Sequence, residues 1–324
     1  MNREPFISII IPVYNCFKYM DKCIDSLEKQ TCKDFKVIFI EDCSKDDTYI
    51  KLKEKLKTVT FDYLLLKNEK NCGPGKTRNR GLIEAQSKYL TFIDSDDYVT
   101  YDFIDIIKQT IVDSKCDILL FDYYSVRKDK LKKAKAINVN KTNISNEEYL
   151  ALTCGMCWGK VYKKDVVNSI SFPEITRGED LAFSKVALSK GEKIKYIEKP
   201  LYYYVQNDTS IMHSASTINI DNNKEAFKYI EKNITKIECV EMIFIREYMY
   251  QIVELMIKLK YSKEDITSFI NECNQMYPNW NKNKYIAFQP KHVKIILSFI
   301  NKKWLLPIRL LFKIKEIRNV FRFL

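Results

Sequence analysis

Glycine and histidine are scarce in this sequence: of 324 residues, only 7 are glycine and 2 are histidine. The low glycine content excludes collagen-like and glycine-rich linker architectures. No apolar run reaches the length of about 18 residues that a membrane-spanning helix needs, so we predict none. The apolar stretch from Ile7 to Val13 is too short for a signal-peptide core, and we expect the 10 cysteines to stay reduced in the cytoplasm.

Metal-binding motifs built from cysteine and histidine are also missing. Cys154 and Cys157 form the only C-x-x-C pair of the sequence, and neither His213 nor His292 follows at zinc-finger spacing. We therefore interpret the cysteines as small buried hydrophobic residues. Glycine-rich phosphate loops are absent too, because the glycines of segment 73–77 have the wrong spacing. If the protein binds a nucleotide diphosphate, a cation has to replace the missing nest of backbone amides.

The chain has enough apolar residues to bury a core, since 46% are hydrophobic and 30% are charged. This composition excludes a wholly disordered protein, and the length fits one large domain or one domain with an appendage.

The net charge of +12 is concentrated in residues 290–324, which contain nine basic residues and a single acid, Glu316. This tail is also strongly apolar, a combination typical of a helix that lies on a membrane surface. The alternative is a helix pair that packs on the main domain. We expect no nucleic-acid binding, because no RNP, zinc-finger or helix-turn-helix signature is present.

Short apolar runs alternate with helical patterns in the first part of the chain. The predicted strands are 7–13, 35–40, 61–66, 89–93 and 117–121, and the predicted helices are 17–30, 48–56 and 75–86. This alternation indicates an α/β fold with a mostly parallel sheet covered by helices on both faces. We interpret 127–146, which is rich in lysine and asparagine, as a variable loop, and the chain beyond about residue 221 as purely helical.

Polar residues directly follow three of the predicted strands, at 13–15, 41–42 and 94–97. Ligands of open α/β sheets bind beyond the carboxyl ends of the strands, so these segments are candidates for a binding site. The acidic segment 94–97 offers clustered oxygen ligands of the kind that Mg²⁺ or Mn²⁺ prefers. A metal there stabilises charge on a departing diphosphate. The alternative interpretation of the segment is a polar turn that caps the next helix.

Five motifs in consistent order and spacing resemble the family 2 glycosyltransferases. They are IIIPVYN at 9–15, VIFIEDCS at 37–44, NCGPGKTRNRGL at 71–82, FIDSDDY at 92–98, and GEDL at 178–181 with PLYYY at 200–204. The resemblance covers roughly residues 6–213 and departs from the family at Cys43, where glycine is more usual. It implies a GT-A fold, a Rossmann-like and mostly parallel sheet flanked by helices, in residues 1–215. Residues 216–324 then form an α-helical C-terminal region.

The resemblance also implies an activity, the inverting transfer of a sugar from a nucleotide-diphosphate sugar to a glycan or a lipid-linked acceptor, with a UDP-sugar as the expected donor. Matched position by position, the residues that hold the donor nucleotide are Pro12, Tyr14, Asp42, Asp94 and Ser95. In this match, Asp42 accepts a hydrogen bond from the uracil imide, and Asp94 faces the ribose or the sugar. The expected cofactor is Mn²⁺ or Mg²⁺, and its implied ligands are Asp96, Asp94 and His213. The alternative for His213 is a histidine at the surface or in the packing.

Asp180 is implied to be the catalytic base, while Glu179 contacts the acceptor or braces the loop. An inverting displacement at an anomeric carbon needs one base on the acceptor side, and a base contributes about 10²–10⁴-fold. Because a carboxylate with an ordinary pKa of about 4 is already ionised at neutral pH, we expect Asp180 to need positioning more than a shifted pKa. The alternative role of Asp180 is to cap a helix over 181–189, and both roles are compatible.

Three further side chains are open to two interpretations. Lys76 and Arg78 either meet the donor phosphates or carry solvated charge on a helix. Trp158 either stacks on a sugar ring or packs in the core.

The sequence thus predicts a metal-dependent, inverting glycosyltransferase. We expect it to be peripheral on the inner face of the cell membrane, where it extends a lipid-linked glycan such as a capsule or surface polysaccharide. A nucleotidyltransferase is the alternative enzyme, but segment 12–15 lacks the basic, glycine-rich loop on which such enzymes rely. An inactive membrane-peripheral scaffold is the non-enzyme alternative, and it would be expected to lack Asp96 or Asp180.

Overall fold

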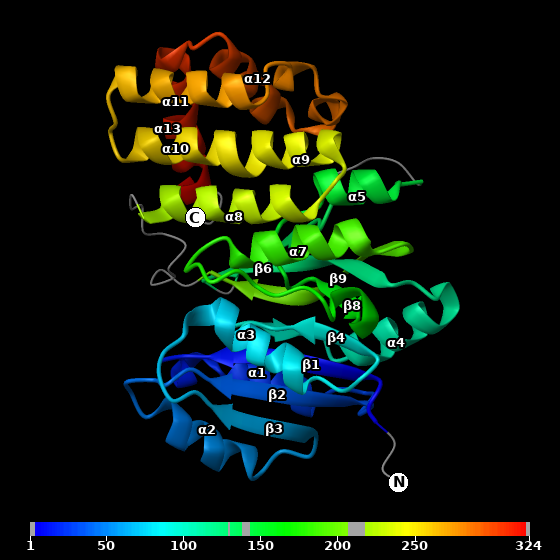
Figure 1. Ribbon diagram of the computed structural model, residues 1–324. Coiled ribbons are helices and arrows are strands. Elements are labelled where there is room, and N and C mark those ends of the chain that lie inside the picture. Colours follow the sequence, from blue (N-terminus) through cyan, green and yellow to red (C-terminus); the bar gives the residue numbers. More distant parts are fainter. Residues whose placement is uncertain (1–3, 129, 138–142, 207–217, 322–324) are drawn as a thin grey trace. The chain divides into compact units, whose positions relative to one another are not determined.

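The computed structural model describes residues 4–128, 130–137, 143–206 and 218–321 (Figure 1). The chain forms two compact units, the first from Met1–Ala136 with Cys154–Gln206 and the second from Ile137–Thr153 with Asn207–Leu324. The predicted domain boundary at residue 215 falls in 207–217, outside the described residues, and stays a prediction.

The first unit is built on one mixed sheet (Figure 1). Its strands are β1 (Ile7–Val13), β2 (Phe35–Glu41), β3 (Asp62–Lys67), β4 (Tyr89–Phe92), β5 (Tyr98–Val99), β6 (Ile118–Arg127), β7 (Lys130–Ala134), β8 (Lys160–Lys163) and β9 (Ile194–Val205). Their order is β3-β2-β1-β4-β8-β6-β9-β5, with β7 paired to β6. The strands β3, β2, β1 and β4 are parallel, and β8 runs antiparallel between β4 and β6.

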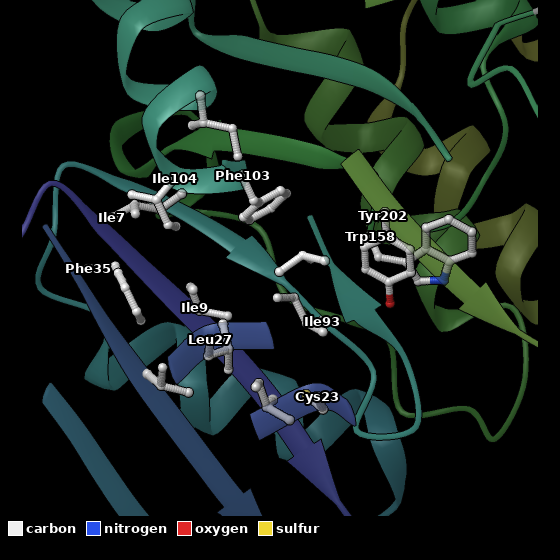
Figure 2. Close-up of a cluster of buried hydrophobic side chains, with 14 of the residues drawn as sticks. Ile7, Ile9, Cys23, Leu27, Phe35, Ile93, Phe103, Ile104, Trp158 and Tyr202 are labelled. Carbon is white, nitrogen blue, oxygen red and sulfur yellow. The ribbon is translucent and has the colours of Figure 1, made fainter. Parts of the chain in front are cut away.

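Helices cover both faces of this sheet, as expected for strands that are apolar on both sides. The helices of the unit are α1 (Asp21–Glu28), α2 (Thr48–Leu56), α3 (Gly73–Glu84), α4 (Phe103–Ser114), α6 (Lys164–Val167) and α7 (Glu179–Lys190). One face packs against α1, α2 and α4 in a single buried cluster that includes Ile9, Leu27 and Phe103 (Figure 2). The α/β fold class is therefore confirmed.

Helix α3 lies close against the opposite face because Gly81 has no side chain. A Cβ atom at Gly81 would come within 2.4 Å of Ile10 and 2.9 Å of Ile40, which belong to β1 and β2. This close contact holds the C-terminal half of α3 against β1 and β2.

The second unit is helical in its described part. Its helices are α5 (Asn146–Leu152), α8 (Ile218–Asn233), α9 (Ile237–Ile243), α10 (Tyr250–Lys258), α11 (Lys263–Met276), α12 (Lys291–Asn301) and α13 (Leu305–Phe321), with a π-helical segment (Phe244–Met249) between α9 and α10. Reciprocal capping boxes start α5 at Ser145 and α11 at Ser262. Within the described residues, no helix combines the length and the apolar character that crossing a bilayer requires.

One expectation and one alternative interpretation need correction. Segment 127–146 is not one variable loop, because Lys130–Ala134 pairs with β6 as the antiparallel strand β7. The acidic segment 94–97 does not cap the next helix, because β5 intervenes and α4 begins only at Phe103.

Candidate active site

The carboxyl edge of β1 and β2 is organised by Asp42, which is buried. Its Oδ1 accepts hydrogen bonds from the Asn68 side chain at 2.7 Å and from the Cys72 amide at 2.9 Å, and its Oδ2 accepts one from the Gly73 amide at 2.8 Å. Asp42 therefore fastens the N-terminus of α3 to the end of β2. The next residue, Cys43, has φ of 56°, which explains why glycine suits this position better.

Pro12 and Tyr14 lie at the end of β1 and just beyond it. Pro12 is half-buried and pairs with Ile40 of β2, whereas Tyr14 is exposed. The loop that follows β1 is tied to the loop after β2, since the Asn15 amide donates to Ser44 Oγ at 3.0 Å. Both predicted nucleoside contacts therefore lie at the same strand edge as Asp42.

Arg78 links two acidic segments that are far apart in the sequence. Its guanidinium donates to Asp94 Oδ1 at 2.8 Å and to Glu179 Oε1 at 2.9 Å. The Arg78 side chain is buried, and it lies over the ring of Phe172 at 5.6 Å. The interpretation of Arg78 as solvated helix charge is therefore wrong. Lys76, in contrast, is exposed and forms an ion pair with Glu174 at 2.8 Å.

The acidic segment after β4 is held in place by Asp97, a residue that the sequence analysis did not single out. Asp97 is buried, and its carboxylate accepts hydrogen bonds from the Tyr202 hydroxyl at 2.6 Å and from the Val205 amide at 2.7 Å. The same hydroxyl of Tyr202 accepts a hydrogen bond from the Asp94 amide at 3.1 Å. Burial, together with the charges of Asp96 and Asp94, raises the pKa of Asp97 well above its ordinary value.

Ser95 is directed away from this network. It is buried, and its Oγ lies 3.0 Å from the Sγ of Cys16. Asp94 and Asp96 are the members of the segment that are half-buried rather than buried. Strand β9 therefore fixes the backbone of the segment while two of its carboxylates keep access to solvent.

Asp180 lies in the first turn of α7, which starts after Gly178 with φ of 83°. Its Oδ1 accepts a hydrogen bond from the Leu181 amide at 2.7 Å. Burial and the neighbouring charge of Glu179 raise the pKa of Asp180 to about 7, although Arg78 opposes the shift. The expectation of an ordinary pKa is therefore wrong, because the packing that places this carboxyl also desolvates it.

The wall beside Asp180 is formed by the turn that precedes β8. A Cβ atom at Gly155 would come within 2.4 Å of the Leu181 side chain, so the turn packs directly on the start of α7. The buried ammonium of Lys160 donates to the carbonyls of Cys154 at 3.1 Å and Met156 at 2.5 Å. The motif search missed Lys160, although a lysine inside an apolar strand is an available signal of a buried charge.

Trp158 packs in the core of this site. Its ring stacks on Tyr202 with centroids 4.6 Å apart and on Tyr204 at 5.2 Å, and only 5% of Trp158 is exposed. Of the two interpretations of this tryptophan, core packing is the one that the contacts support.

A metal ion in this site has to rely on few protein ligands. Among the residues that the structure describes, no group of three or more His, Cys, Asp or Glu side chains is arranged to hold a metal. His213 lies outside the described residues. Asp97 is engaged by β9 and one oxygen of Asp94 by Arg78. Of the metal ligands expected from the sequence, Asp94 and Asp96 are described, and both are half-buried. Mg²⁺ commonly binds through one or two carboxylates plus substrate phosphates, and this donor set fits that pattern.

Comparison with known proteins gives consistent results. Residues 8–171 match the sequence profile described as "Glycosyl transferase family 2". The glycosyltransferase GlyA of Streptococcus pneumoniae is 29% identical over 211 residues, which cover 61% of this chain and 30% of GlyA. The poly(ribitol-phosphate) beta-N-acetylglucosaminyltransferase TarS of Staphylococcus aureus is 27% identical over 243 residues, which cover 72% of this chain and 41% of TarS. This chain therefore spans less than half the length of either relative.

Solved structures share the fold. A crystal structure of S. aureus TarS residues 1–349 with UDP has a TM-score of 0.69 at 21% identity and covers 95% of this chain and 90% of that one. The same part of TarS has also been crystallised with UDP-GlcNAc. The mannosyltransferase PcManGT from Pyrobaculum calidifontis, in complex with GDP-Man and Mn²⁺, has a TM-score of 0.58 at 10% identity and covers 99% of this chain and 88% of that one.

Proposed function

The chain belongs to glycosyl transferase family 2, and from this premise we propose that it transfers a sugar from a UDP-sugar with inversion at the anomeric carbon. The observation that carries the proposal is the guanidinium of Arg78, which joins Asp94 at 2.8 Å to Glu179 at 2.9 Å. This link brings the acidic segment after β4 next to the start of α7, where Asp180 lies. A donor-binding cluster and a base are thus held side by side.

The nucleoside is assigned to the edge formed by Pro12, Tyr14 and Asp42. The base-pairing edge of uracil offers an imide N–H, and a carboxylate with four acceptor positions can take it in addition to its protein partners. Asp42 already accepts three hydrogen bonds, so it holds the α3 N-terminus and the base together. The structure of TarS with UDP-GlcNAc supports a uridine donor. Because PcManGT was crystallised with GDP-Man, a guanosine donor is the alternative that a binding experiment has to compare.

Asp180 is the proposed general base. Its carboxylate takes the proton of the acceptor hydroxyl as the oxygen attacks the anomeric carbon from the face opposite the diphosphate. The bond to the diphosphate breaks in the same displacement, and the product leaves with inverted configuration. A pKa of about 7 suits this role, because a base is most effective when its pKa lies near the working pH.

The departing diphosphate carries charge that the protein has to balance. Asp96, with Asp94, would hold Mn²⁺ or Mg²⁺, which when bound stabilises the charge that develops on the leaving group. Glu179 and Arg78 keep Asp94 in place, since their side chains are paired with each other and buried. Lys76 is a second candidate for contact with the phosphates because it lies on the first turns of α3 and is exposed.

The proposed acceptor is a glycan on a lipid carrier, with the enzyme at the inner face of the cell membrane. The similarity of the chain to the poly(ribitol-phosphate) beta-N-acetylglucosaminyltransferase TarS and the basic, apolar segment 290–324 support this assignment. The acceptor sugar would approach from the side of Asp180.

Nucleotide binding provides the first test. Calorimetric titration with UDP and GDP, each with and without Mn²⁺, is expected to show tight binding only for UDP with the metal. Asp96→Asn is expected to weaken binding in the presence of Mn²⁺ and to leave the metal-free affinity unchanged. Equal affinity for GDP, or binding of UDP that is indifferent to Mn²⁺ in the unmodified protein, contradicts the donor assignment.

Transfer kinetics test the base. Asp180→Asn is expected to lower kcat by about 10²–10⁴-fold and to preserve UDP affinity, because only the proton transfer is lost. Asp165→Asn, an exposed carboxylate on α6, is the matched control and retains full activity. Undiminished transfer by Asp180→Asn removes this residue from the chemistry.

A further inference from the structure

Helix α13 is apolar on two opposite sides. Its inner stripe, Leu305, Ile308 and Phe312, is buried, and the ring of Phe312 meets Tyr250 at 5.4 Å. Its outer stripe consists of Leu306, Leu310 and Ile314, which are 84%, 60% and 38% exposed, respectively. Residues four apart lie one above the other on a helix, so these three side chains form a continuous apolar ridge. A helix that is apolar on its outer side is typically covered by something else.

A further exposed aromatic ring, that of Trp304, lies at the corner between α12 and α13, where it stacks on Phe299 with the ring centres 5.9 Å apart. This indole is 54% exposed, and the ammonium of Lys302 lies 4.9 Å from the centre of its ring. Tryptophan is enriched where an apolar phase meets water, because its ring is apolar and its N–H is polar.

The border of the ridge is uniformly basic. Lys302, Lys303, Arg309 and Lys313 are all exposed, and the sequence from 290 to 314 contains no acidic residue. Arg309 and Lys313 lie on the same turns as Leu310 and Ile314, so cations line one side of the ridge along the helix.

We propose that this surface, defined by Trp304, Leu306, Leu310 and Ile314 with the basic border, docks onto the anionic headgroups of a lipid bilayer. The apolar ridge enters the interface between headgroups and acyl chains, and the lysines reach outward to lipid phosphates. A second copy of the chain fits less well, because a twofold contact on this ridge sets the same cations against one another. The inference specifies the membrane partner of the proposed function and depends on that function only for the identity of the acceptor.

Vesicle flotation of the full chain tests the proposal. Vesicles of an equal mixture of phosphatidylcholine and phosphatidylglycerol are compared with vesicles of phosphatidylcholine alone, and the variants are Leu306→Ser with Leu310→Ser, and Lys303→Gln with Lys313→Gln. We expect the unmodified protein to float with the anionic vesicles. The double variant Leu306→Ser with Leu310→Ser (the serine pair) is expected to lower the partition coefficient onto these vesicles roughly 10- to 100-fold. The double variant Lys303→Gln with Lys313→Gln (the glutamine pair) is expected to lower it roughly tenfold or more.

The matched control is Ile50→Ser with Ile237→Ser. These isoleucines are 66% and 77% exposed on α2 and α9, so the control removes the same kind of surface elsewhere and should float like the unmodified protein. Serine-pair flotation equal to that of the unmodified protein overturns the proposal, as does equal binding to both kinds of vesicle. A dimer in solution that the serine pair dissociates, without flotation, assigns the ridge to a second copy and also overturns it.

UDP binding by the same variants separates this inference from the proposed function. The serine pair should bind UDP like the unmodified protein, because the donor residues belong to the other unit. Flotation without UDP binding in the unmodified protein leaves the docking surface intact and removes the enzyme assignment.

Discussion

At the scale of single residues, the surroundings of Asp180 determine the pKa of the proposed base. Its carboxyl is desolvated and lies next to Glu179, while Arg78, which pairs with Glu179, favours the ionised form. The protonated form of Asp180 therefore persists to nearly neutral pH, and its ionised fraction depends first on desolvation and then on the opposing charges of Glu179 and Arg78. A carboxyl in this setting titrates in the pH range in which a general base works, so the pH dependence of transfer tests the role proposed for Asp180.

The pH dependence of transfer follows from this balance. Because the base must be ionised, kcat/KM should rise with pH and level off above an inflection at about 7. Glu179→Gln removes the raising charge of Glu179 and should move the inflection to lower pH, by on the order of one unit. Rate profiles measured with saturating donor, alongside the exposed control Glu54→Gln, provide the check.

The raised pKa of Asp180 also makes the free energy of unfolding depend on pH, and the direction of this dependence follows from the shift. The pKa of Asp180 is raised on folding, so the folded protein holds this proton more tightly than the unfolded chain does. The contribution of Asp180 to stability is then fully present below about pH 4 and is lost as the pH rises to about 7.

The rate profiles also have an outcome that contradicts the role of Asp180. An inflection of kcat/KM near pH 4, or an inflection that Glu179→Gln does not move, would show that Asp180 is not the titrating base.

The sequence identified the residue types of this site but not their contacts. Arg78 is 16 residues from Asp94 and 101 residues from Glu179, so only the folded sheet brings the three together. The same limitation applies to the pKa of Asp180, because desolvation depends on neighbours that no local pattern specifies.

At the scale of elements, β9 and the acidic segment after β4 form one rigid junction. Tyr202 accepts from the Asp94 amide and donates to Asp97, and the Val205 amide completes the pair of bonds on Asp97. The Thr100 amide adds a further tie, to the carbonyl of Leu201 at 3.0 Å. The segment that is proposed to contact the donor is thus held by a strand as well as by its own turn, in which the Asp97 amide donates to the Asp94 carbonyl at 3.0 Å.

Tyr202→Phe should loosen this junction. The change removes one hydroxyl and leaves both the Asp94 amide and the Asp97 carboxylate short of a partner in a buried place, at a cost of roughly 2–4 kcal/mol. Urea unfolding measures that cost, and UDP affinity should fall in parallel. Tyr204→Phe is the control, because the ring of Tyr204 stacks on Trp158 as that of Tyr202 does. Removal of the Tyr204 hydroxyl should lower the free energy of unfolding by less than about 0.5 kcal/mol. Equal effects of the two changes would show that the hydroxyl of Tyr202 carries no special role.

Element prediction succeeded where periodicity was strong and failed where it was weak. The strands 7–13 and 35–40 and the helix 48–56 agree with β1, β2 and α2 to within one residue, because each has a clear apolar pattern. Strand β7 was missed, since four of its five residues are exposed and three of the five are lysine. Its strand conformation comes from pairing with β6, which is a tertiary effect.

At the scale of the whole molecule, the cysteines act as packing residues in both units. None of the ten forms a disulfide, and six of them are buried, namely Cys16, Cys23, Cys116, Cys157, Cys239 and Cys273. Burial raises the pKa of the Cys157 and Cys273 thiols, which keeps them in the unreactive protonated form.

Thiol titration without reductant should therefore count all ten cysteines in urea. In the folded protein, the half-buried Cys32, Cys43, Cys72 and Cys154 should react first, and the six buried thiols should lag by orders of magnitude. A count below ten in urea would indicate a disulfide, and uniform rates in the folded protein would contradict the burial pattern.

The pairing of Asp97 with Tyr202 also sets an order of assembly during synthesis. The two residues are 105 positions apart, and β9 is the last strand of the sheet to leave the ribosome. At about 5–20 residues per second, the ribosome takes roughly 5–20 s to travel that distance. A nascent chain that ends before Tyr202 already contains the strands β1 to β4, yet its acidic segment still lacks this support. The segment proposed to contact the donor thus gains this support only when the last of the described strands of the sheet has been synthesised.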